Sequence, residues 1–311
     1  MSEATPIEWC DSAVNPVMGC DGCELWQPAR DLRTCYAGAL HEMRGGNPGY
    51  AKDFLQPETF AGRMAAAARW SDLRGIARPG RRDNQGKWKQ KPKPWLDGRP
   101  RHIFISDMGD ALSASVTFEF LLAEIIAAVT SAKGLRHIWM WLTKQPKRMA
   151  QFAEWLAARG IAWPVNLWAG TSLTEPQYVA RLDQLRRVPA ATRFLSIEPQ
   201  AADVGMLDLR GIALAIMGGE SGPRARPYDI AWTRALIRQC DAAGTAVFVK
   251  QLGAHIVWDG ASGPGEHWPA AALRVTADGN WRVLLRDPKG GDWSEWPADL
   301  RRREWPEVSH G

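Results

Sequence analysis

Short apolar runs that end abruptly in polar residues recur along the chain, each followed by a turn and an amphipathic stretch. The runs cover residues 102–106, 137–143, 166–170, 193–197, 214–219 and 246–250, and a further one lies near 14–18. Continuous apolar runs bounded by turn residues are typical of strands buried on both faces, as in a parallel sheet. Apolar residues at three- and four-residue spacing predict helices at about 118–132, 145–159, 175–187 and 228–243.

This alternation of strands and helices predicts βαβ units. The number of strands favours an α/β fold with a complete or partial (β/α) TIM-like barrel over a small open sheet. We expect the barrel over 1–255, with a basic insertion at 75–100, and a C-terminal appendage at 256–311. The appendage is rich in turn residues, and the sequence ADGN between LRV and WRVLL predicts a hairpin within it.

Polar residues follow the predicted strands at their carboxyl ends, where α/β folds carry their functional groups. Each one taken alone is equally well explained as a loop-start or helix-cap residue. Their recurrence at six successive strand ends favours a shared pocket. These residues are Ser106, Asp107, Asp110, Thr143, Lys144, Thr171, Ser172, Ser196, Glu198, Glu220, Ser221, Lys250 and Gln251.

Three of the five cysteines lie close together after the first predicted strand. Cys20, Cys23 and Cys35 form a C-x2-C-x11-C arrangement, and such an odd, clustered set indicates metal binding or catalysis rather than a disulfide framework. The spacing leaves three alternatives: a four-iron cluster with one iron that lacks a protein ligand, a zinc site closed by a fourth ligand, or unligated thiols. Cys10 and Cys240 stand alone, and we expect them to be buried core residues.

The composition sets further limits on the class of protein. The chain has 311 residues, of which 45% are hydrophobic and 23% charged, and this is the profile of a folded protein with a core. It contains neither the ~20 consecutive apolar residues of a membrane span nor the features of a signal peptide, so we expect a cytoplasmic protein without membrane contact. No P-loop, GxSxG, HExxH or EF-hand pattern supports nucleotide hydrolysis, serine hydrolysis or zincin proteolysis.

The net charge of +5 is concentrated in one segment. Ten basic residues against two acidic ones lie between Arg74 and Arg101, and the rest of the chain is about neutral. Residues 75–100 are rich in Pro, Gly and Lys and lack apolar periodicity, so we expect a solvated insertion. Because Trp88 and Trp95 are interleaved with the basic residues, the segment 74–101 is a candidate contact for DNA or RNA, with a solubilising surface loop as the alternative.

Tryptophan is unusually frequent, with 17 residues against 8 Phe and 4 Tyr. Several tryptophans occupy core-like positions in or beside the predicted strands and helices. We interpret these as packing residues rather than as a platform for bases. They are Trp139, Trp141, Trp155, Trp163 and Trp168.

The order of short motifs along the chain resembles that of a known family. The motifs, from Ile7 to about Trp296, are IEWCDSAVNPVMGC, TCYA, SDMGDAL, WLTK, LWAGTS, FLSIEP, GGESG and VKQLG. They look like those of phage-associated and bacterial proteins of unknown function, which resemble radical S-adenosylmethionine (SAM) enzymes in their three cysteines and barrel fold. The resemblance implies a 4Fe–4S cluster on Cys20, Cys23 and Cys35, with SAM bound to its open iron.

The same resemblance implies a reaction. Reductive cleavage of SAM, with electrons from a flavodoxin- or ferredoxin-like donor, would give a 5′-deoxyadenosyl radical that abstracts hydrogen from a nucleic-acid or small-metabolite substrate. The chemistry of the strand-end residues then suggests roles toward SAM: Lys144 and Lys250 for its carboxylate, Ser106, Thr171 and Ser172 for its carboxylate or ribose, and Asp107, Glu198 and Glu220 for its amino or ribose groups. A buried Lys or Glu at a strand end is equally explained by a structural ion pair.

Two function classes therefore remain. The first is a radical SAM-type iron–sulfur enzyme, lyase-like or transferase-like. The second is a nucleic-acid-binding protein without catalysis, in which the cysteines bind zinc or a cluster and serve folding alone. Metal content and SAM cleavage together distinguish the two classes, because the first requires iron, sulfide and cleavage of SAM, whereas stoichiometric zinc without SAM cleavage after reduction supports the second.

Overall fold

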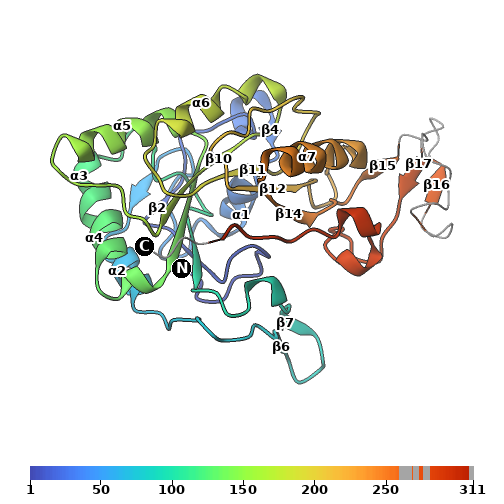
Figure 1. The fold of residues 1–311 in the computed structure, drawn as a ribbon, viewed down its shortest axis with the longest axis horizontal. Coiled ribbons are helices and arrows are strands. Elements are labelled where there is room, and N and C mark those ends of the chain that lie inside the picture. Colours follow the sequence, from blue (N-terminus) through green and yellow to red (C-terminus); the bar gives the residue numbers. More distant parts are fainter. Residues whose placement is uncertain (259–267, 269–272, 276–280, 308–311) are drawn as a thin grey trace. The chain divides into compact units, whose positions relative to one another are not determined.

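The computed structural model describes residues 1–258, 268, 273–275 and 281–307. It divides into two compact units, which are described separately below: Met1–Thr171 with Asp183–Thr192, and Ser172–Leu182 with Arg193–Gly311 (Figure 1). The α-helices are α1 (Tyr36–Arg44), α2 (Arg63–Ala68), α3 (Phe118–Leu121), α4 (Ala127–Thr130), α5 (Pro146–Ala157), α6 (Arg181–Arg186) and α7 (Ile230–Ala243). The strands of parallel sheet are β1 (Ser12–Val14), β8 (His102–Ile105), β9 (Ile138–Thr143), β10 (Leu167–Ser172), β11 (Arg193–Ile197), β12 (Leu214–Gly218) and β14 (Ala246–Gln251).

The remaining strands are short. They are β2 (Val17–Met18), β3 (Trp26–Gln27), β4 (Leu32–Arg33), β5 (Glu58–Thr59), β6 (Arg81–Arg82), β7 (Trp88–Gln90), β13 (Tyr228–Asp229), β15 (Ile256–Trp258), β16 (Leu273–Val275) and β17 (Trp281–Val283). In the first unit they form the two-stranded pairs β2-β5, β3-β4 and β6-β7.

The first unit is built on parallel strands in the order β1-β8-β9-β10. Ser12 lies opposite Ile103, and Leu167 lies opposite Trp139. Every residue of β8 is buried, and so are all but one of β9. This is the pattern of strands covered on both faces, so the apolar runs predict these strands correctly.

Two long helical segments of the first unit follow directly from the sequence. Helix α5 begins at Pro146, where a missing N–H costs nothing, and it buries an apolar stripe that includes Met149, Phe152 and Leu156. Helices α3 and α4 are joined by the π-helical turn Leu122–Ile126 into one segment, at whose start the Thr117 side chain accepts the N–H of Phe120. The helices predicted at about 118–132 and 145–159 are therefore confirmed.

The second unit carries parallel strands in the order β11-β12-β14, together with the four-stranded sheet β13-β15-β17-β16. Helix α7 starts where the Asp229 carboxylate accepts the N–H of Ala231, and it ends at Gly244 in the left-handed conformation. Strands β16 and β17 pair antiparallel, as the predicted hairpin requires. Its ADGN turn lies outside the described residues.

These observations confirm the α/β class with parallel strands, and they are compatible with a partial TIM-like barrel. The radical SAM type of the barrel and the division at residue 255 stay predictions. Cys10 and Cys240 are buried, as expected for core residues. No helix in the described part of the chain is long and apolar enough to cross a membrane.

The tryptophans expected to pack are buried at four of the five positions. Trp139, Trp141 and Trp168 are almost fully covered, and Trp163 stacks on Trp141. Trp155 is half-buried, with the Arg159 guanidinium 3.6 Å from the centre of its ring. Packing therefore explains this set.

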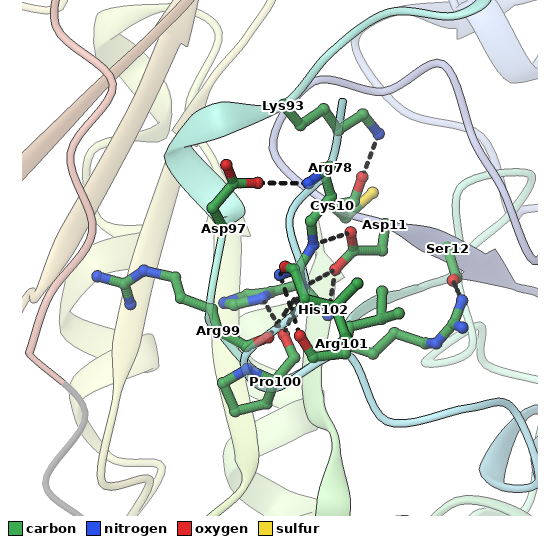
Figure 2. Close-up of polar contacts among 12 residues, drawn as sticks. Cys10, Asp11, Ser12, Arg78, Lys93, Asp97, Arg99, Pro100, Arg101 and His102 are labelled. Atoms are coloured by element: carbon green, nitrogen blue, oxygen red, sulfur yellow. Dashed lines mark hydrogen bonds and ion pairs between the residues drawn. The ribbon is translucent and has the colours of Figure 1, made fainter. Parts of the chain in front are cut away.

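The basic insertion is not the uniformly solvated loop that its composition predicts. Arg78 is buried, and its guanidinium pairs with the buried Asp11 carboxylate, with Nε 3.1 Å from Oδ1 (Figure 2). It also donates to four backbone carbonyls, those of Leu73, Ile76, Arg99 and Pro100. One guanidinium thus ties the start of the insertion to its end and to the residue before β1.

Lys93 of the insertion and Arg101, which directly follows the insertion, are also buried and hydrogen-bonded within the protein. The Lys93 ammonium is buried and donates to the carbonyls of Thr5 and Ile7. It also donates to the carbonyl of Cys10, as Figure 2 shows. Arg101 is buried and donates to Ser12 Oγ at 2.9 Å. The expectation of a solvated segment is wrong at these positions, because backbone carbonyls and a buried carboxylate supply the polar partners that burial requires.

Candidate functional site

The loop that carries the first two cysteines is locked onto the segment after β8. Gly19 N donates to the Met108 carbonyl at 3.2 Å, and Asp110 N donates to the Gly19 carbonyl at 3.1 Å. A Cβ on Gly109 would lie 2.3 Å from the Gly19 oxygen, and Gly19 itself has φ +90. Glycine is therefore required at both positions, and the motifs NPVMGC and SDMGD form one interlocked structure.

Asn15 at the end of β1 is the principal cross-link of this structure. Its Nδ2 donates to Asp107 Oδ1 at 2.5 Å, and its Oδ1 accepts the N–H of Met108 at 2.9 Å. Its own carbonyl accepts from the Arg63 guanidinium at 2.9 Å. Asn15 is buried, and its side chain links the half-buried Asp107 carboxylate to the end of β1.

Asp110 extends the same network to the end of β9. Its fully buried carboxylate accepts from Thr143 Oγ1 at 2.7 Å, from Lys144 N at 3.1 Å and from Leu112 N at 2.9 Å. Burial raises the pKa of Asp110, and these hydrogen bonds partly offset that shift. The carboxyl ends of β1, β8 and β9 are thereby joined around the cysteine loop.

The three clustered cysteines are half-buried on this loop. Leu25 N donates to Cys23 Sγ at 3.4 Å. Burial raises the pKa of Cys20 and of Cys23, the nearby Cys35 adds to both shifts, and the Lys144 ammonium opposes the shift of Cys23. Across the described residues, no three His, Cys, Asp or Glu side chains meet in a metal-binding arrangement.

An apolar floor underlies the cysteine loop. Cys20 and Cys35 pack against a buried cluster that contains Trp26, Phe54 and Met108. Helix α1 starts immediately after Cys35. A group held by these sulfurs would have an apolar environment on one side, which strengthens electrostatic interactions there.

Lys144 lies beside the loop as well. Its Nζ is 4.0 Å from Glu24 Oε1, and the Glu24 side chain is buried. Lys144 is the predicted SAM ligand of the first unit that carries a positive charge, and this charge counteracts the raised pKa of Cys23.

Ser106 has the two features that most directly indicate a ligand. It adopts φ 75, a left-handed conformation that costs a residue with a side chain on the order of 1–3 kcal/mol. Its Oγ is buried and has no hydrogen-bond partner among the described residues. Its position directly after β8 and before Asp107 places this unpaired hydroxyl on the same interlocked segment.

Thr171, by contrast, already has a partner in the first unit. Its Oγ1 donates to the Thr143 carbonyl at 2.8 Å, so its hydroxyl proton is used within the sheet. The first unit therefore brings together Ser106, Asp107, Lys144 and the cysteine loop. Thr171 instead uses its hydroxyl to link β10 to β9.

The predicted site residues of the second unit are largely paired with protein groups. Glu198 forms an ion pair with Lys250, and both side chains are mostly buried. Glu220 accepts from the Arg226 guanidinium at 2.8 Å, and the carbonyl of Ser172 accepts from Arg181 at 3.0 Å. Glu198, Lys250 and Glu220 thus take part in ion pairs within the protein, which is the alternative to a SAM contact that the sequence left open.

Sequence reasoning missed several polar residues of these regions. The only sequence feature that points to Asn15 is the Asn-Pro pair at the end of the first predicted strand. The only one that points to Glu24 is its position between Cys23 and Cys35. Gln200, which follows β11, has neither amide atom hydrogen-bonded within the described residues, although it is 2% exposed. Nothing in the local sequence distinguishes Gln200 from a loop residue.

A cavity of about 460 Å³ occurs elsewhere in the first unit. It lies along α2 and α4, where Ala65, Arg69, Ala127 and Lys133 are among its lining residues, and no predicted site residue lines it. The Glu124 carboxylate at its wall already accepts the N–H groups that start α2. We assign this cavity no role.

Comparison with known proteins gives one result. A family described as "Protein of unknown function (DUF5131)" matches residues 4–290. Comparisons with curated proteins and with solved structures find no match. Because the family match covers nearly the whole chain, including the cysteine loop and both sets of parallel strands, the chain belongs to this family of unknown function, DUF5131.

Proposed function

We propose that Cys20, Cys23 and Cys35 hold a 4Fe–4S cluster and that the protein is an enzyme of the radical SAM type. The observation that carries the proposal is the fixed position of the cysteine loop. Backbone hydrogen bonds of Gly19 with Met108 and Asp110 attach the start of this loop to the carboxyl end of β8, and the side chains of Asn15 and Asp110 join that end to β1 and β9. Functional groups of parallel α/β folds gather at that edge.

The chemistry of the cysteine loop supports an iron–sulfur cluster, because three half-buried cysteines supply the ligand type that such clusters use. The three thiols do not meet in a metal-binding arrangement in the structure, so cluster binding would require them to converge. The Leu25 N–H points at Cys23 Sγ, and backbone N–H donors to ligand sulfurs are among the groups that tune such clusters. The apolar floor beneath Cys20 and Cys35 limits solvent access from below.

The chemistry that such a cluster supplies when bound is one-electron reductive cleavage of SAM, after which hydrogen is removed from a substrate. The protein's own part is to position the reactants. Asn15 and Asp110 join the strand ends beside the loop, and the Ser106 hydroxyl, unpaired within the described residues, offers a hydrogen bond to a polar group of SAM. Lys144 offers a cation to the SAM carboxylate near Cys23. The electron comes from a separate flavodoxin- or ferredoxin-like donor.

In the second unit, a role toward SAM requires a change of partner. The Glu198 and Lys250 side chains are ion-paired, and Glu220 is paired with Arg226. The SAM contacts suggested by the sequence for Ser172, Glu198, Glu220 and Lys250 therefore stay predictions, and the proposal for the cysteine loop does not use them.

The test is anaerobic reconstitution with iron and sulfide, followed by incubation with SAM and dithionite. The proposal predicts 5′-deoxyadenosine, its loss in Cys20→Ala, and its retention in Cys240→Ala, because Cys240 is a buried cysteine of the second unit. Ser106→Ala should lower the rate while leaving iron content unchanged. Absence of 5′-deoxyadenosine from protein that carries a full, reducible cluster would contradict the SAM part of the proposal.

The second candidate is a nucleic-acid-binding protein in which the cysteines bind metal for folding only. The exposed basic hairpin described below favours it. The same preparation tests it, because this candidate predicts stoichiometric zinc and no SAM cleavage after reduction.

A further inference from the structure

The basic insertion separates into a structural base and an exposed tip. Arg78, Lys93 and Arg101 are buried and hydrogen-bonded at the base. Between Arg78 and Lys93, strands β6 and β7 pair antiparallel and form a hairpin that extends away from the rest of the first unit (Figure 1). We call residues 80–92 the basic tip.

The basic tip carries a strong positive charge with little to neutralise it. It contains five basic residues and one acidic residue, a net charge of +4. Arg81, Lys87 and Lys89 are exposed and take part in no ion pair within the described residues. Because Arg78, Lys93 and Arg101 are buried and hydrogen-bonded within the protein, most of the solvent-accessible positive charge of the segment 74–101 lies on this hairpin.

The single acidic residue of the tip is turned toward the backbone. Asp83 Oδ1 accepts the N–H of Gln85 at 3.0 Å and the N–H of Lys87 at 2.9 Å, and Gly86 closes the turn with φ +81. The carboxylate thus shapes the turn instead of pairing with a basic side chain. This arrangement fixes the spacing of the basic residues around the turn.

An aromatic ring stands among these charges. Trp88 is 37% exposed, and the Arg82 guanidinium stacks on its ring at 3.7 Å from the centre. An arginine and an indole ring are thus stacked against each other on the hairpin. Trp95, the other tryptophan of the insertion, donates its N–H to the Glu8 carbonyl and belongs to the base.

We propose that the basic tip, residues 80–92, binds the phosphate backbone of a single-stranded nucleic acid, with Trp88 stacking on a base. A row of lysines and arginines beside an exposed aromatic ring is the combination that such binding uses. An acidic protein would use the charge alone, and an anionic membrane, which also accepts basic residues with tryptophan, is the alternative that the vesicle measurement below tests. The proposal goes beyond the cluster chemistry and does not depend on it.

The test measures the affinity of the full-length protein for a fluorescein-labelled 20-nucleotide single strand of DNA or RNA at several salt concentrations. Lys87→Ala/Lys89→Ala should weaken binding about 25-fold at 0.1 M salt and reduce the salt slope by about 1.4, as two lost phosphate contacts require. Trp88→Ala should weaken binding at least ~5-fold, and Trp88→Phe should restore most of it, because stacking needs only a ring.

Lys133→Ala/Lys289→Ala is the matched control, since it removes two exposed lysines outside the tip. It should bind like the wild type, and melting temperatures verify that all variants fold. Equal losses in the control and tip variants would overturn the proposal, and so would unchanged binding by the tip variants. Binding to vesicles with anionic lipids in preference to both oligonucleotides would overturn it as well. Loss of SAM cleavage would leave these binding results unaffected, so the two proposals fail separately.

Discussion

The buried Arg78–Asp11 pair gives the sharpest prediction about the fold. Replacing Arg78 with Leu leaves the Asp11 carboxylate, whose side chain is 4% exposed, without its cation. It also removes the donors of four backbone carbonyls. Breaking a buried ion pair by removing one partner costs about 3–5 kcal/mol, because an uncompensated buried charge remains. We expect Arg78→Leu to lower the free energy of unfolding by that amount.

The assay is urea denaturation followed by tryptophan fluorescence, with Arg81→Leu as the matched control. Arg81 belongs to the same insertion but is exposed, so its substitution should change the free energy of unfolding by less than about 0.5 kcal/mol. A difference of less than about 1 kcal/mol between the two variants would refute the reasoning that the base of the insertion is structural.

Three further predictions follow from the same contacts. Asn15→Ala removes a donor from the half-buried Asp107 carboxylate and the acceptor of the buried Met108 N–H, and it should destabilise the protein by about 1–3 kcal/mol in the same urea assay. A loss below about 0.5 kcal/mol would contradict the role of Asn15 as a cross-link. Lys144→Met should weaken the retention of iron by the reconstituted protein about 10-fold or more. Lys147→Met, the control at an exposed lysine of α5, should retain iron like the wild type. Equal retention of iron in the two variants would show that Lys144 has no role at the cysteine loop. Burial lowers the pKa of His102 from 6.5 to about 4, so the unfolded chain binds the proton first and stability falls as the pH drops from 6.5 toward 4. His102→Asn should flatten that fall by roughly 3 kcal/mol, measured as the free energy of unfolding across this pH range, and an unchanged pH profile would show that His102 does not titrate as its burial requires.

Much of the fold could be predicted from local pattern because apolar runs and helical spacing report burial directly. The strand β8 lies within one residue of its predicted range, and β9 does as well. The π-helical turn Leu122–Ile126 could not be predicted in this way. It coincides with a tertiary contact, in which the Glu124 carboxylate accepts N–H groups of Gly62 and Met64 at the start of α2.

The candidate site was predicted unevenly for a similar reason. The spacing of Cys20, Cys23 and Cys35 is a local signal, and so is the placement of Ser106 at a strand end. The role of Asn15 depends on Asp107, which lies on another strand end far along the chain. Arg78 shows the same limit: its residue type predicts exposure, and only the buried Asp11 carboxylate reverses that expectation.

The metal content of the cysteine loop tests the central claim most directly. Protein purified and reconstituted without oxygen should contain about four iron and four sulfide per chain and show the brown colour of a 4Fe–4S cluster. Cys35→Ala should lose both, while Cys240→Ala, which removes a buried cysteine of the second unit, should keep them. Stoichiometric zinc without sulfide, or equal iron in the two variants, would contradict the account.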